Sequence, residues 1–215
     1  MLTKKYHTLY LPFPSDIHQQ LYNLYRDLGQ KYGNQYLDEK SWLAKITIGV
    51  LPLPDKETQR FVDLCHTVLS GVRPFLVELS KFTISPEGKY IFLSFSPATD
   101  KIVWGLRHNF EKAMVGFDVQ IPDKYLEKWD VYASRQHDLL KQFGSPYEFE
   151  PHLSLVKFEV AQTKQAIKEL NVSQFAGVSF TASEFCVSSQ SEDPNNQYPV
   201  LERIMLRGKQ KLSPV

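Results

Sequence analysis

Two strand-like segments, about half a chain length apart, carry the side chains best suited to chemistry. Residues 45–51 read KITIGVL and residues 152–158 read HLSLVKF. Side chains alternate along a strand, so the basic first residue and the hydroxyl-bearing third residue of each segment share one face. The four side chains are Lys45, Thr47, His152 and Ser154. If they met at one point, their nitrogen and hydroxyl groups would suit the oxygens of a phosphodiester.

A second pair of similar segments indicates an internal repeat. Residues 80–85 read SKFTIS and residues 183–188 read SEFCVS. Each pair member comes after a motif strand and a helix-like stretch, so each half is predicted to contain a motif strand, a helix and a hairpin. We expect a single bilobal domain over residues 1–215, in which the motif strands are related by a pseudo-repeat. A cleft between two such lobes is a common place for a ligand site.

The remaining elements are predicted from hydrophobic spacing and from turn residues. Residues 6–12 favour a strand, and Ser15 begins a helix that is expected to stop near Gly29. The other predicted elements are a helix from about residue 55 to Gly71, a hairpin over 75–85 and 89–95, a helix from Pro97 with an apolar stripe of Ile102, Leu106, Phe110 and Ala113, a helix over 130–143, and a short helix over 163–170 before a last hairpin.

Composition excludes several classes of protein. The 25 basic and 24 acidic side chains leave a net charge of +1, so any contact with RNA would have to be local. Cys65 and Cys186 lie in apolar stretches and are expected to be free, buried thiols. No uncharged apolar run approaches the ~20 residues that a membrane-spanning helix needs. We therefore expect a cytoplasmic protein with no membrane partner.

The paired motifs resemble those of the two-histidine phosphoesterase superfamily, which includes bacterial RNA 2′,3′-cyclic phosphodiesterases, also called 2′-5′ RNA ligases. The resemblance rests on PHLSL at 151–155, KITI at 45–48, their separation and the repeated order of elements. It implies an α+β, bilobal, duplicated fold, with two antiparallel sheets facing a central cleft and helices on the outside. It further implies metal-free hydrolysis or transfer at a cyclic phosphate, with an RNA 2′,3′-cyclic phosphate end or a cyclic nucleotide as the partner. We also expect a monomer without a cofactor.

The resemblance also implies roles for the motif residues. One histidine of such a pair removes a proton from the attacking water and the other protonates the leaving oxygen, and His152 can fill either role. Thr47 and Ser154 would hold the non-bridging phosphate oxygens. Lys45, however, stands where the family has its first histidine. A reference lysine has a pKa of about 10.4 against about 6.5 for histidine, so Lys45 could act as a base near neutrality only if its pKa fell by about three units.

Three hypotheses follow from this substitution. Lys45 acts as an acid or electrophile in a slower or altered esterase; His7, on the first strand, enters the cleft as a replacement; or the degenerate site binds a nucleotide or RNA end without cleaving it. The sequence leaves the first and third open. As an ammonium, Lys45 could still donate hydrogen bonds to phosphate oxygens, so binding would survive better than turnover.

Four further side chains are accessory candidates. Arg203 and Arg207 alternate on the last strand and could reach a phosphate or stack on a base, although edge strands often carry such charges to prevent pairing. Tyr147 and Phe149 precede the second motif and could stack on a base, although packing is the favoured interpretation. The polar loop over 189–199 fits either a lid or a plain solvent loop.

Overall fold

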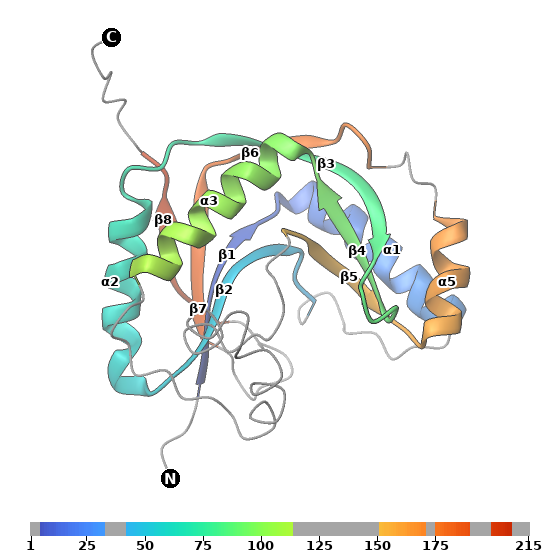
Figure 1. The fold of residues 1–215 in the computed structure, drawn as a ribbon, viewed down its shortest axis with the longest axis horizontal. Helices are drawn as coiled ribbons and strands as arrows, with labels where there is room; N and C mark the ends of the chain where they lie inside the picture. The colour runs from blue at the N-terminus through green and yellow to red at the C-terminus, as the bar shows by residue number, and fades with distance from the viewer. Residues whose placement is uncertain (1–4, 33–41, 114–150, 171–174, 190–198, 208–215) are drawn as a thin grey trace.

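The computed structural model describes residues 5–32, 42–113, 151–170, 175–189 and 199–207. Figure 1 shows two sheets whose helices lie on their outer sides. The elements are β1 (Lys5–Pro12), α1 (Ser15–Tyr32), β2 (Lys45–Leu53), a 3-10 turn (Asp55–Glu57), α2 (Thr58–Leu69), β3 (Phe75–Ile84), β4 (Tyr90–Phe95), α3 (Pro97–Ala113), β5 (Leu153–Lys157), α5 (Val160–Glu169), β6 (Ser179–Ala182), β7 (Glu184–Ser189) and β8 (Val200–Met205).

Each sheet has four strands, and every pairing is antiparallel. The first sheet has the order β2-β1-β7-β8 and the second has the order β5-β4-β3-β6. Helices α2 and α3 pack on the first sheet, and α1 and α5 pack on the second. The α+β fold with antiparallel sheets and outer helices is therefore confirmed.

The two motif strands occupy matching edges of the two sheets. Strand β2 is the edge of the first sheet and β5 is the edge of the second. Residues of these two strands approach to within 8 Å between Cα atoms. The fold therefore brings the two halves of the predicted site to the line where the sheets meet.

The hairpins are exchanged between the halves of the chain. The β3–β4 hairpin, which follows β2 in sequence, pairs with β5, and the β7–β8 hairpin, which follows β5, lies in the sheet of β2. Strands β3 and β7 occupy the third position of their sheets, with Phe82 and Phe185 both buried. Strands β4 and β8 do not match, because β4 is second in its sheet and β8 is fourth. The predicted equivalence of the hairpins therefore holds only for their first strands.

Two details of the helices differ from the sequence prediction. Helix α1 does not stop near Gly29 but continues to Tyr32, whose ring packs edge-on against Phe158 at a centroid distance of 5.5 Å. In α3 the buried face contains Val103, Leu106 and Phe110, whereas Ile102 is 38% exposed. The predicted stripe was wrong by one residue at its start, because Ile and Val are equally apolar and tertiary packing selects between them.

Further comparisons with the sequence predictions concern helix α5, strand β6 and the two cysteines. Helix α5 starts at Val160, earlier than expected, because Glu159 and Gln162 form a reciprocal capping box. Strand β6 was not predicted. Cys65 and Cys186 are free and buried, as expected. In the described part of the chain, no helix is both long and apolar enough to cross a membrane. The predicted helix over 130–143 lies outside the described residues.

Candidate functional site

Strand β2 separates its apolar and polar side chains onto two faces. Ile46 and Ile48 are fully buried, in the core that α2 and α3 cover. Lys45 and Thr47 alternate with them and are partly buried. Across the ladder, Pro12 is opposite Lys45 and Tyr10 is opposite Thr47. The predicted basic group and hydroxyl of the first motif therefore share one face of the first sheet with Tyr10.

Burial changes the acidity of Lys45. Its Nζ lies 5.8 Å from the centroid of the Tyr10 ring, and desolvation by the surrounding protein lowers the pKa of Lys45 to about 7. Burial raises the pKa of Tyr10, and Cys186, its cross-strand partner on β7, adds to the shift, so the phenol stays neutral. Tyr10 therefore supplies no negative charge that would keep Lys45 protonated. At neutral pH the neutral amine and the ammonium are both populated.

His7 lies on the other face of the same sheet. It is fully buried, its Nε2 lies 2.8 Å from Oγ1 of Thr58 and its ring centroid is 5.8 Å from that of Phe61. Thr58 and Phe61 both belong to α2. Because β1 alternates, His7 faces opposite to Tyr10 and Lys45. The hypothesis that His7 enters the site as a replacement histidine is therefore wrong.

The second motif lies on β5 and on the residue before it. Leu153 and Leu155 are buried and Ser154 is exposed. His152 stacks face to face on Phe92, with ring centroids 3.9 Å apart and an interplanar angle of 21°. Phe92 is also the cross-strand partner of Ser154. The imidazole of His152 is therefore held against the ring of a neighbouring strand, on the face that carries Ser154.

The stack continues along β4. The Tyr90 ring lies 6.0 Å from that of Phe92 with an interplanar angle of 28°, and Nζ of Lys157 lies 5.3 Å from the Tyr90 ring centroid. Neither Phe92 nor Tyr90 was predicted to belong to the site. The alternation of YIFLSF in β4 contains the signal, since it places both aromatic rings on one face, but the sequence does not say that β4 pairs with β5.

The two predicted arginines occupy different places. Arg203 on β8 is the cross-strand partner of Cys186, and its Nη1 donates to Oε1 of Glu184 at 2.6 Å. It therefore shares the face of Tyr10, but β1 and β7 lie between it and β2. Arg207 is exposed beyond the end of β8. The structure thus brings neither arginine next to Lys45.

Some candidates cannot be placed. Tyr147 and Phe149, and most of the loop over 189–199, lie outside the described residues. Within the described ranges, no three His, Cys, Asp or Glu side chains gather as a metal site would require.

The fold has clear relatives among solved structures. Protein TT0787 of Thermus thermophilus matches with a TM-score of 0.63 and 17% identity, over 97% of this chain and 100% of that one. E. coli LigT, crystallised with 3′-AMP, matches with a TM-score of 0.62 and 13% identity, over 95% of this chain and 99% of LigT. A structure described as a phosphoesterase matches with a TM-score of 0.59 and 12% identity, over 95% and 99% of the two chains.

These neighbours have the fold of the two-histidine phosphoesterases, which the paired motifs predicted, so the fold inferred from the resemblance is confirmed. At such low identities, the likeness establishes the fold alone. No family model matches the chain, and no curated protein matches it in sequence.

Proposed function

We propose that this chain is a phosphodiesterase-like enzyme that acts, without a metal, on a cyclic phosphate of RNA or of a nucleotide. The observation that carries the proposal is that burial lowers the pKa of Lys45 to about 7, near the value at which a histidine would titrate. The neighbouring fold supports a nucleotide ligand, since E. coli LigT is crystallised with 3′-AMP, with ATP and with phosphate.

The lowered pKa makes proton transfer by lysine feasible. When water attacks a 2′,3′-cyclic phosphate, a bond forms between the water oxygen and phosphorus, and one of the two ring P–O bonds breaks. The neutral amine of Lys45 takes the proton that the water loses, and protonated His152 gives a proton to the leaving ribose oxygen. Positioned acid-base groups of this kind each contribute about 10²- to 10⁴-fold.

The same geometry supplies charge stabilisation. Thr47 shares a face of β2 with Lys45, and Ser154 shares a face with His152, so their hydroxyls can donate hydrogen bonds to the non-bridging oxygens. After accepting the proton, Lys45 becomes a compact cation next to the phosphorane-like transition state. A lysine therefore offers a positive charge at the moment when the negative charge on phosphate oxygens is largest.

The test is an assay with 2′,3′-cyclic nucleotides and with oligonucleotides that end in a cyclic phosphate. We expect turnover by the wild-type protein, loss of turnover in His152→Ala, and unchanged turnover in the control His66→Ala, whose side chain pairs with Glu202 on the outer face. If the wild type is inactive and Lys45→His gains activity, the chain is instead a nucleotide- or RNA-end-binding module. Unchanged activity in His152→Ala would remove the site assignment.

The proposal also includes a monomer acting in the cytoplasm, as predicted from the sequence. Light scattering of the purified protein at assay concentration measures the oligomeric state. Fractionation of cells followed by immunodetection measures the localisation.

A further inference from the structure

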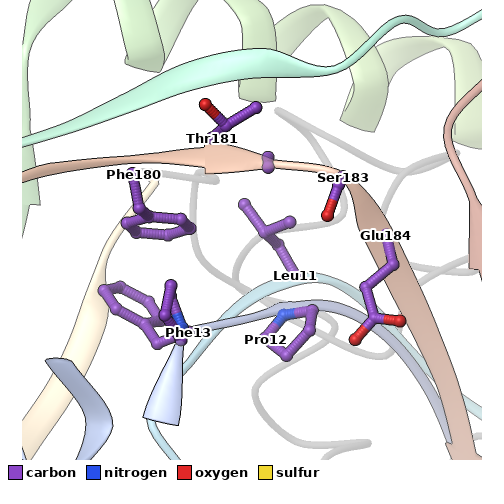
Figure 2. A pocket seen from close by; sticks show the side chains of 9 residues that line it. Leu11, Pro12, Phe13, Phe180, Thr181, Ser183 and Glu184 are labelled. Carbon is purple, nitrogen blue, oxygen red and sulfur yellow. The ribbon is translucent and has the colours of Figure 1, made fainter. Parts of the chain in front are cut away.

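A pocket of about 240 Å³ lies where the end of β1 meets the turn from β6 into β7. Residues 11–14 line one side of the pocket and residues 180–184 line the other. Figure 2 shows that these two chain segments, far apart in sequence, face each other across it.

This pocket adjoins the candidate site. Pro12, which lines the pocket, is the cross-strand partner of Lys45. Glu184, which also lines it, lies two residues before Cys186, the cross-strand partner of Tyr10. A molecule with a phosphate at Lys45 could therefore place a second group in the pocket without crossing a strand.

The walls of the pocket are apolar at one end and acidic at the other. The rings of Phe13 and Phe180 pack together with centroids 5.0 Å apart, and Figure 2 shows them at the end opposite to the Glu184 carboxylate. The exposed side chain of Ser183 lies next to that carboxylate. Arg203 holds Oε1 of Glu184 at 2.6 Å, which fixes the carboxylate in place.

These walls select the chemistry of the occupant. An ionised carboxylate repels a phosphate and accepts hydrogen bonds but donates none. Aromatic rings favour a flat, polarisable group. The complementary ligand is a flat heterocycle with hydrogen-bond donors along one edge.

We propose that this pocket binds the nucleobase of the nucleotide whose phosphate lies at Lys45 and His152, and that Glu184 makes it prefer guanine. Guanine carries neighbouring N–H donors at N1 and N2, which match the two oxygens of a carboxylate. Uracil offers a single N–H, which lies between two carbonyl oxygens. The carboxylate of Glu184 repels these oxygens. The inference rests on the proposed function, because it takes the occupant to be part of a nucleotide substrate.

Binding of nucleosides without a phosphate tests the pocket separately from catalysis. In calorimetric titrations of the full chain, we expect guanosine to bind about 10- to 100-fold more tightly than uridine, which is the size expected for hydrogen bonds to a charged group. Glu184→Gln should weaken guanosine binding by a similar factor and change uridine binding little. Glu202→Gln is the matched control, because Glu202 contacts His66 of α2 on the other face of the sheet.

A second variant tests the pocket without changing the ion pair between Glu184 and Arg203. Ser183 is exposed, so Ser183→Tyr should fill the pocket without disturbing the core, and we expect it to abolish guanosine binding. Equal affinities for guanosine and uridine, or full guanosine affinity in both Glu184→Gln and Ser183→Tyr, would overturn the inference.

The two proposals fail in different ways. If guanosine binds selectively but no cyclic phosphate is hydrolysed, the pocket assignment stands and the proposed catalytic activity is lost. If 2′,3′-cyclic GMP and 2′,3′-cyclic UMP are hydrolysed with equal kcat/KM and Glu184→Gln leaves both unchanged, the activity stands and the base preference is lost.

Discussion

The two motif strands present the same pattern of a basic side chain and a hydroxyl, but they hold the basic group in different ways. On the β5 side, His152 stacks on Phe92 at 3.9 Å next to the exposed Ser154. On β2, Lys45 is partly buried beside the Tyr10 ring. One strand orients its basic group by ring stacking, and the other surrounds it with protein.

The difference matters because the two basic groups start from different acidities in water. An imidazole titrates near neutrality in water, so the second motif needs only to orient it. An amine titrates more than three pH units higher, so the first motif can transfer protons near neutrality only if its environment disfavours the ammonium. In this chain the environment of Lys45 does so, with a pKa of about 7. Under the proposed mechanism, residue type supplies the proton-transfer group of one motif strand and burial supplies that of the other.

Replacing Lys45 with a permanently charged side chain is expected to have the largest effect on activity. Lys45→Arg keeps a cation but cannot release a proton near neutrality, so we expect kcat to fall by about 10²- to 10⁴-fold. Binding of a product nucleotide, measured by calorimetry, should change much less. His152→Gln is the matched variant on the other strand and should cost a similar factor. Full activity in Lys45→Arg would show that Lys45 acts only through its charge.

The cost of burying Lys45 should appear in stability. The folded pKa of about 7 lies below the unfolded pKa, so the unfolded chain binds more protons between pH 7 and about 10.4. The free energy of unfolding of the wild type, relative to Lys45→Met, should therefore be lowest below pH 7 and rise through that window, by at most about 5 kcal/mol. Urea unfolding at several pH values measures it. A difference that does not change with pH would show that the amine is not desolvated.

The same pKa should shape the rate profile. If neutral Lys45 is the base, kcat/KM should fall about tenfold per pH unit as the pH drops below 7, because the free enzyme becomes protonated. Lys45→His should retain an acidic limb, whereas Lys45→Met should lose it. Because protonated His152 is also required, the wild-type rate should fall at higher pH as well, so the acidic limb is the part that tests Lys45. An acidic limb that persists in Lys45→Met would show that Lys45 is not the base.

Replacing Phe92, the stacking partner of His152, should have the smallest effect on activity. Aromatic pairs contribute about 0.5–1.5 kcal/mol beyond burial, so Phe92→Leu should lower kcat by about 2- to 10-fold with little change in KM. Phe92→Tyr keeps the ring and should restore kcat. The His152 imidazole resonances should shift in Phe92→Leu and not in Phe92→Tyr. Unchanged resonances in Phe92→Leu would mean that the stack does not orient His152.

Much of this arrangement could be predicted from local patterns. The alternation in residues 45–51 and 152–158 gave the strands and the pairing of each basic group with a hydroxyl, because a strand period of two is fixed by the backbone. The hairpin over 75–85 and 89–95 followed from the turn at Gly88, which has a positive φ of 76°. These features depend on a few neighbouring residues.

The rest depends on pairings between distant segments. The burial of His7 follows from α2 covering that face of the first sheet, and the stack of Phe92 on His152 follows from β4 pairing with β5. The lowered pKa of Lys45 comes from desolvation by the protein around it. Desolvation is a property of the assembled fold, so the sequence alone does not show that the pKa of a lysine in a motif is lowered.

The exchange of hairpins also bears on how the chain folds as it leaves the ribosome. Strand β2 and its Lys45 are made before β7 and β8, but their sheet is finished only when those two strands have been synthesised. Pairings across such sequence distances form slowly. Cys186, the cross-strand partner of Tyr10, belongs to one of these strands, β7. Until β7 and β8 have been synthesised, the sheet that carries Lys45 is therefore incomplete.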